Sequence, residues 1–141
     1  RRLKFDNNTI KDVCKLVRWH DFGMGCVPKK NTIRKLLGEV GKDFFPYIIE
    51  IKKADMAAQS DYKLEERQSQ LAELEKKYEE IVADADCVRI KDLKVNGGDL
   101  IKLGIKPGPQ MGEILQKLLD MVIEDPEKND REYLIEQVKM M

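Results

Sequence analysis

The chain has 141 residues, a length that suits one domain or two small ones with a modest buried core. Charged residues make up 37% and aromatic residues 6%, a balance that favours helix over sheet in a soluble protein. No apolar run approaches the roughly 20 residues needed to span a bilayer, so no membrane span is expected. Cys14, Cys26 and Cys87 match no zinc or disulfide spacing, so we expect reduced thiols in a cytoplasmic protein.

Basic and acidic residues both number 26, and a net charge of zero argues against a strong general affinity for nucleic acid. The charges nevertheless lie in blocks. Residues 1–54 hold 13 basic against 6 acidic residues, and residues 87–117 hold 6 against 3. Residues 55–86 and 118–141 are acidic, with 4 basic against 10 acidic and 3 against 7. Folding could gather the basic blocks onto one face; the alternative is an ordinary mixture of solvated charges.

The apolar spacing predicts helices from the start of the chain. The first is expected to begin with a cap at Asn7 or Asn8 and to end near His20. The second begins with a cap at Asn31 and ends at Gly41. The third begins near residue 43, with a proline in its first turn.

A long helix is predicted over residues 61–85, with a polar outer face and a heptad-like stripe. The stripe consists of Leu64, Leu71, Leu74, Tyr78, Ile81 and Val82. It suits an internal packing seam, and pairing with a second chain is the alternative. After a break at residues 86–95, helices are expected at residues 98–103, at 109–124 and from a cap at Asn129. The helix at 109–124 carries a core-facing apolar stripe, formed by Met111, Ile114, Leu115, Leu118, Leu119 and Val122. The predicted fold is therefore all-α, a helical bundle followed by a small helical domain.

Residues 104–112, which we call the glycine turn, join two of these helices. The turn holds Gly104, Gly108, Gly112 and two prolines. A helix that opens at Pro109 would direct free amides and its positive dipole end outward, which suits a phosphate. A corner that binds nothing is the alternative.

The sequence around this turn resembles a known family. Residues 92–100 read DLKVNGGDL, residues 104–108 GIKPG and residues 112–115 GEIL. Together with EDPEKNDREYL at 124–134, LVRWHD at 16–21 and IKKADMAAQ at 51–59, they resemble bacterial tRNA nucleotidyltransferases, the CCA-adding enzymes grouped with poly(A) polymerases. The resemblance covers nearly the whole chain. It implies the second half of a body or HD-like domain over residues 1–60, a long connecting helix over 61–85 and a tRNA-binding tail over 86–141.

In that family a head domain carries the catalytic Asp-x-Asp motif on a sheet, after a Gly-rich turn. The pair in Asp84-Ala85-Asp86 follows a predicted helix, where solvated carboxylates are expected. We therefore expect a C-terminal fragment, inactive alone, whose parent binds Mg²⁺ and CTP or ATP in the missing head. Whether that parent adds CCA, CC, A or poly(A) is not indicated.

The expected partner is tRNA, recognised by shape and phosphate. The predicted contacts come from the side chains of Lys94, Lys102 and Lys106, from the backbone at Gly108 and Gly112, and from Asn96, which could donate to a phosphate or a 2′-hydroxyl. A weaker second basic patch comprises Arg1, Arg2, Lys29, Lys30, Arg34 and Lys35.

Two other functions remain open. His20, Asp21 and Asp55 could form part of the metal site of an HD-type phosphohydrolase, although three candidate ligands make an incomplete centre and a helix-end histidine is the simpler interpretation. The chain could also be a protein-interaction module that forms a homodimer through residues 61–85.

Overall fold

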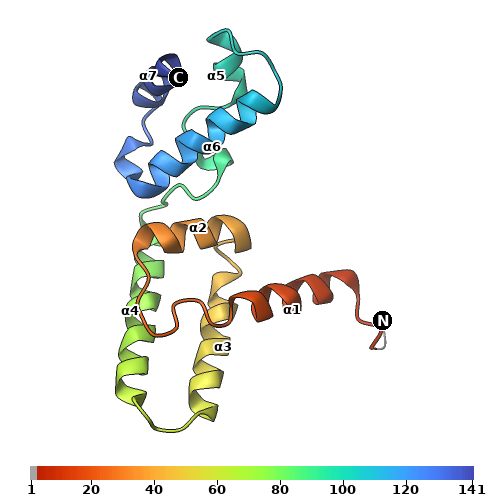
Figure 1. Cartoon of the computed structure of the whole chain (residues 1–141), viewed down its shortest axis with the longest axis vertical. Coiled ribbons are helices and arrows are strands. Elements are labelled where there is room, and N and C mark those ends of the chain that lie inside the picture. Colours follow the sequence, from red (N-terminus) through yellow and green to blue (C-terminus); the bar gives the residue numbers. More distant parts are fainter. Residues whose placement is uncertain (1–2) are drawn as a thin grey trace. The chain divides into compact units, whose positions relative to one another are not determined.

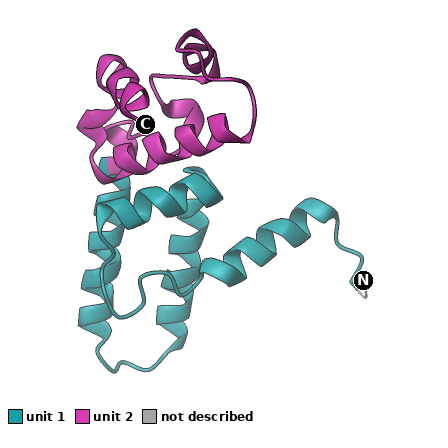
Figure 2. Ribbon diagram, turned by 45° about the horizontal axis from the view of Figure 1, so that its top comes forward, with its two compact units in different colours: residues 1–80 teal, residues 81–141 magenta. Residues whose placement is uncertain are grey.

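The computed structural model describes residues 3–141, and within that range it contains helices and connecting segments but no β-strand (Figure 1). The prediction of an all-α fold is therefore confirmed. The chain divides into two compact units, residues 1–80 and 81–141 (Figure 2). Among the described helices, none has both the length and the apolar character that crossing a membrane requires.

The first unit is built on a helical hairpin, α3 (Phe45–Ala58) followed by α4 (Leu64–Ala83) (Figure 1). It also contains α2 (Lys30–Val40) and α1 (Asn7–Trp19), which contacts α3. The ring of Phe45 stacks on that of Tyr78 with 4.9 Å between centroids, and the Tyr78 hydroxyl donates to the Lys42 carbonyl at 2.9 Å. The buried apolar side chains of this unit are Ile33, Leu36, Leu37, Val40, Phe45, Ile48, Ile49 and Leu74.

The apolar stripe predicted for residues 61–85 packs largely within the unit. Leu74 is buried, Tyr78 stacks on α3, and Lys53 of α3 forms an ion pair with Glu75 of α4 at 2.6 Å. These contacts support an internal seam. Val82 does not belong to it, because its side chain remains 41% exposed.

Two predicted helix caps in this unit are wrong. Asp6, rather than Asn7 or Asn8, caps α1, because its carboxylate accepts two backbone amides and is also favoured by the helix dipole. The second helix begins at Lys30, one residue earlier than the cap predicted at Asn31, and it has no side-chain cap. The predicted end of that helix at Gly41 is confirmed.

The second unit is centred on α6 (Pro109–Glu124), which is preceded by η1 (Ile90–Asp92) and α5 (Gly97–Lys102) and followed by η2 (Pro126–Lys128) and α7 (Arg131–Met140). The predicted stripe of α6 is confirmed, since it supplies much of the core. The buried residues of this core are Cys87, Leu93, Val95, Leu100, Ile114, Leu118, Leu119, Val122, Ile123, Leu134 and Val138.

The predicted cap of the last helix is also wrong, because Asp130 caps α7, whereas Asn129 bonds to a distant segment of the chain. The Asn129 side chain accepts the backbone amide of Lys94 at 3.0 Å and donates to the carbonyl of Asp92 at 3.1 Å. It therefore ties the segment before α5 to the segment before α7. An isolated sequence pattern cannot distinguish this long-range use of an asparagine from a local cap.

Candidate nucleic-acid interface

The glycine turn begins where α5 ends. Gly104 has a φ of 89°, a left-handed conformation that glycine adopts without steric cost. Its amide donates to the carbonyl of Ile101 at 2.9 Å, and the next amide, of Ile105, donates to that of Leu100 at 3.1 Å. These two hydrogen bonds form a Schellman motif, which terminates α5 and fixes the direction of the chain as it enters the turn.

The start of α6 is open to solvent. Gly108 is extended, with a φ of 161°, and Pro109 occupies the first helical turn. The amide of Met111 already donates to the Gly108 carbonyl at 3.1 Å, whereas the amide of Gln110 has no acceptor within the helix because of its position at the helix start. A Cβ atom added at Gly108 or Gly112 would meet nothing within 4 Å. The fold itself therefore leaves space beside both glycines.

Three predicted lysines are exposed around this region. Lys94 precedes α5, Lys102 is its last residue, and Lys106 lies within the turn. In residues 3–141 none of the three forms an ion pair. Lys102 and Lys106 lie on either side of Gly104 in the sequence, so the chain carries two exposed cations shortly before α6 begins.

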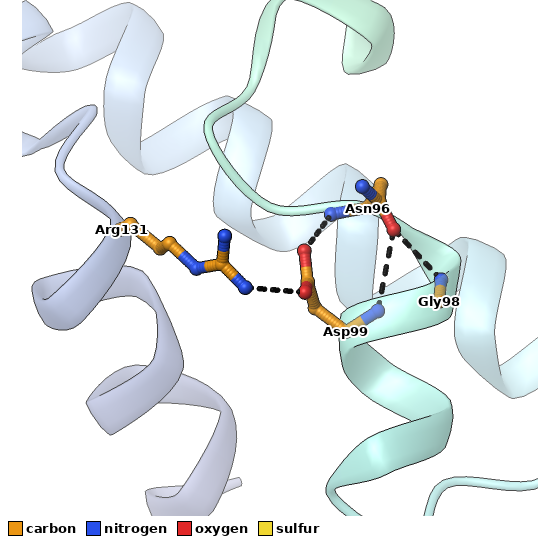
Figure 3. A network of polar contacts seen from close by, with 4 residues as sticks. All are labelled: Asn96, Gly98, Asp99 and Arg131. Atoms are coloured by element: carbon orange, nitrogen blue, oxygen red, sulfur yellow. Dashed lines mark hydrogen bonds and ion pairs between the residues drawn. The ribbon is translucent and has the colours of Figure 1, made fainter.

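Asn96 caps α5 as part of a capping box (Figure 3). Its side-chain oxygen accepts the amides of Gly98 at 2.8 Å and Asp99 at 3.2 Å, and the Asp99 carboxylate accepts the Asn96 amide at 3.2 Å. The other oxygen of that carboxylate accepts from Nη2 of Arg131 at 2.6 Å. The cap engages the Asn96 oxygen and leaves its side-chain NH2 group, the group that would make the predicted donation to RNA.

The network of Asn96, Asp99 and Arg131 was missed by the sequence analysis. An Asn-x-x-Asp spacing is a recognisable capping-box signal, so the local part could have been predicted. The pairing with Arg131 joins residues 32 positions apart, and no local pattern indicates it.

The weaker basic patch is not gathered into one exposed surface. Lys29 and Lys35 are exposed, whereas Lys30 pairs with Glu80 at 2.6 Å and Arg34 is only 8% exposed. The remaining two members, Arg1 and Arg2, lie outside the described residues. The exposed cations of the second unit are therefore the better candidates for contact with RNA.

The first unit contains a cavity of about 400 Å³ between the 20–28 segment, α3 and α4. His20, Lys52 and Asp55 line it, but Asp21 does not. His20 Nδ1 lies 2.6 Å from the Val17 carbonyl, and Asp55 accepts from a glutamine amide. Burial lowers the pKa of Lys52, while Asp21 and Asp55 act in the opposite direction. Nowhere in the described chain do three His, Cys, Asp or Glu side chains come together as a metal site would require.

The carboxylates at the end of α4 differ from the predicted solvated pair. Asp84 is exposed, but Asp86 is buried, and its amide donates to the Ile81 carbonyl at 3.1 Å. Two carboxylates that hold metal ions against a triphosphate must both face the substrate. With one of the pair buried and no strand to carry it, this segment does not fit the Mg²⁺ and nucleotide site of a nucleotidyltransferase.

Comparison with known proteins identifies the family. Residues 1–138 match the family model for tRNA nucleotidyltransferase domain 2. The chain belongs to the tRNA nucleotidyltransferase family. The resemblance on which the sequence analysis rested is thus confirmed.

Parts of this tRNA nucleotidyltransferase chain are similar to three CCA-adding enzymes. The chain is 50% identical over 44 residues to the enzyme of Limosilactobacillus fermentum, and this matched stretch covers 31% of this chain and 11% of that enzyme. It is 46% identical over 52 residues to the enzyme of Ligilactobacillus salivarius, a stretch that covers 36% of this chain and 13% of that enzyme. It is 43% identical over 58 residues to the enzyme of Pediococcus pentosaceus, a stretch that covers 38% of this chain and 15% of that enzyme. The matched stretches therefore take in only 11–15% of those enzymes. No solved structure matches the chain.

Proposed function

We propose that this chain is the tRNA-binding portion of a CCA-adding tRNA nucleotidyltransferase. It would hold the tRNA so that the 3′ end reaches a catalytic site formed by residues outside this chain. The observation that carries the proposal is the glycine turn of the second unit, where Lys102 and Lys106 are exposed without an ion-pair partner among the described residues and where α6 begins with an exposed first turn. The family match and the printed names of the relatives support tRNA as the ligand.

The chemistry of the turn fits an RNA backbone better than a base. Lysine is a flexible point charge that binds phosphate without a fixed orientation, and a helix start adds partial positive charge. Glycine at 108 and 112 leaves space for a ribose-phosphate chain to approach the peptide backbone. These features recognise shape and charge, which is how double-helical RNA is usually recognised.

We place the chemistry of nucleotide addition outside this chain. The described residues provide no strand with paired carboxylates, and the segment around Asp84 and Asp86 does not fit the task. Mg²⁺ and CTP or ATP would therefore be held by a separate nucleotide-adding region of the enzyme, and no step of the reaction is assigned to this chain.

The decisive experiment compares two charge reversals. Lys106→Glu should weaken binding of tRNA that lacks its 3′ end, measured by fluorescence anisotropy, whereas Lys139→Glu, at an exposed position of α7, should not. Loss of one phosphate contact should also reduce the slope of log affinity against log salt by roughly 0.7–0.9. Thermal melting should show both variants folded, because an exposed lysine contributes little to stability.

Two results would overturn this assignment. One is an unchanged affinity and salt slope for Lys106→Glu in a folded chain. The other is an equal loss for both variants, which would indicate a general charge effect with no specific site at the turn.

A further inference from the structure

The cavity of the first unit is enclosed by the 20–28 segment, by α3 and α4, and by the loop that joins these two helices. Contacts outside the lining fix the segment against both helices. The Phe22 ring packs edge-on against Phe45 of α3 with 6.4 Å between centroids, and Lys77 of α4 donates to the Pro28 carbonyl at 3.1 Å. The volume of about 400 Å³ lies within the range of roughly 300–1,000 Å³ that is usual for small-molecule sites.

Lys52 of α3 lines this cavity and is half-buried. Within residues 3–141 its ammonium forms no hydrogen bond and no ion pair. Burial lowers the pKa of Lys52, and the attraction of Asp21 and Asp55 does not reverse the shift. An anion beside this ammonium would therefore compensate for hydration that burial removes.

The guanidinium of Arg67 is a second cation of the lining that forms no ion pair within the described residues. Its terminal nitrogens donate to the Gln59 side chain and to the carbonyls of Ser60 and Tyr62 at 2.5–2.8 Å. All three acceptors are uncharged, and the Nε atom is buried without an acceptor. The positive potential of Arg67 therefore adds to that of Lys52.

The charged groups of the lining leave one positive charge. Three cations and two carboxylates line the cavity: Lys52, Lys63 and Arg67, and Asp55 and Glu66. Lys63 and Glu66 lie 3.8 Å apart and offset each other. A ligand with a single negative charge would balance the site. A phosphate monoester carries about 1.5–2 negative charges at pH 7 and would be repelled by the two carboxylates.

Apolar side chains form another part of the lining. Met24, Met56, Leu71 and Leu74 all contribute to it. The unbranched thioether side chain of methionine adapts to ligands of different shape. Small-molecule sites commonly combine such apolar walls with a few polar groups that fix the orientation of the ligand.

We propose that the cavity of the first unit binds a small monocarboxylic acid with an apolar aliphatic or aromatic body. The carboxylate lies at Lys52, and the apolar body packs against Met24, Met56 and Leu71. This ligand is distinct from tRNA, and its site depends on the first unit alone. The inference therefore goes beyond the proposed function and does not depend on it.

Amide chemical shifts of the full chain test the proposal. The test compounds are octanoate and 2-naphthoate, with 1-octanol and inorganic phosphate as controls that lack either the charge or the apolar body. Both carboxylates should shift amides of residues 20–28 and 52–74 saturably and leave those of residues 81–141 unchanged. The controls should bind at least tenfold more weakly. No saturable shift with either carboxylate, shifts confined to the exposed side chains of α1, or equally tight binding of phosphate overturns the proposal.

Matched lysine substitutions provide the second arm. Lys52→Met keeps an unbranched apolar stem without the charge, so it should weaken octanoate binding about tenfold and leave 1-octanol binding unchanged. Lys52→Arg keeps the charge and should retain octanoate binding. Lys76→Met, at an exposed position of α4 outside the cavity, should have no effect. Unaltered octanoate binding by Lys52→Met, or equal losses in Lys52→Met and Lys76→Met, contradicts the assigned site. Because tRNA is absent from these experiments, their failure is distinct from failure of the proposed function.

Discussion

The guanidinium of Arg131 donates to the carboxylate of Asp99 at 2.6 Å and thereby joins the start of α5 to the start of α7 (Figure 3). The Asp99 side chain is 8% exposed and that of Arg131 57%. Asp99 also accepts the Asn96 amide in the capping box of α5. One carboxylate thus serves a local cap and a contact between helices.

We expect Asp99→Ala to destabilise the chain more than Arg131→Ala. The first change removes both the capping-box hydrogen bond to the Asn96 amide and the ion pair, at a cost of about 2 kcal/mol, whereas the second removes a half-exposed pair worth about 1 kcal/mol. Urea denaturation of both variants and of the double variant measures the coupling. Equal losses in the single variants would show that the capping-box bond of Asp99 adds nothing to the ion pair, and additive losses in the double variant would show that the two side chains act independently.

Short-range patterns predicted much of this molecule, and long-range contacts account for most of what they missed. The stripe of α6 and the end of α2 at Gly41 follow from spacing and local conformation. By contrast, Asn129 was assigned a local cap because its contacts to the 92–94 segment depend on the tertiary fold. Burial of Arg34 and Asp86 could not be foreseen for the same reason, since charged residues are usually exposed.

The cap at Asp6 predicts that α1 responds to acid. The Thr9 hydroxyl, followed by backbone amides, lowers the pKa of Asp6 below its ordinary value of 3.8. A lowered folded-state pKa means that the ionised cap stabilises the helix above the unfolded value and loses this effect as pH falls through the folded value. Amide chemical shifts of α1 should therefore change in an acid titration from about pH 5 to about pH 2.

Asp6→Asn is the control for this titration. Asparagine is a good cap that carries no charge, so α1 should persist and the acid transition of its first turn should disappear. An identical transition in Asp6→Asn would assign the effect to another group.

The end of α4 contains a residue that strains the backbone. Ala85 has a φ of 53°, a left-handed conformation that is unfavourable for residues with a Cβ. Ala85→Gly should therefore stabilise the chain by about 0.5–1 kcal/mol. Ala72→Gly, at an exposed position inside α4, should destabilise the chain by about 1 kcal/mol, because there glycine only adds freedom to the unfolded state. Thermal melting shows whether each change raises or lowers the melting temperature. Destabilisation by both changes would refute backbone strain at Ala85.

The purified chain should not extend tRNA. Among the described residues, Asp84 is exposed but Asp86 is buried, so this pair does not fit a site that positions metal ions against a triphosphate, and incubation with tRNA missing its 3′ end, CTP, ATP and Mg²⁺ should leave the RNA length unchanged. A complete CCA-adding enzyme serves as the positive control on a sequencing gel. Extension that disappears when Asp84 or Asp86 is replaced by asparagine would place catalysis within this chain.

At Gly112, substitution by alanine should affect the stability of the chain and its affinity for tRNA in opposite directions. It lies inside α6, where a Cβ meets nothing within 4 Å, so Gly112→Ala should raise stability by up to about 1 kcal/mol through helix propensity. The same methyl group should weaken tRNA binding if RNA closely approaches the backbone at the start of the helix. Gly104→Ala is the contrasting variant, since its φ of 89° makes alanine strained and should lower the melting temperature. A stabilised Gly112→Ala chain that binds tRNA as tightly as the unaltered protein would show that RNA does not contact the backbone there, leaving the lysines as the only contacts of the turn.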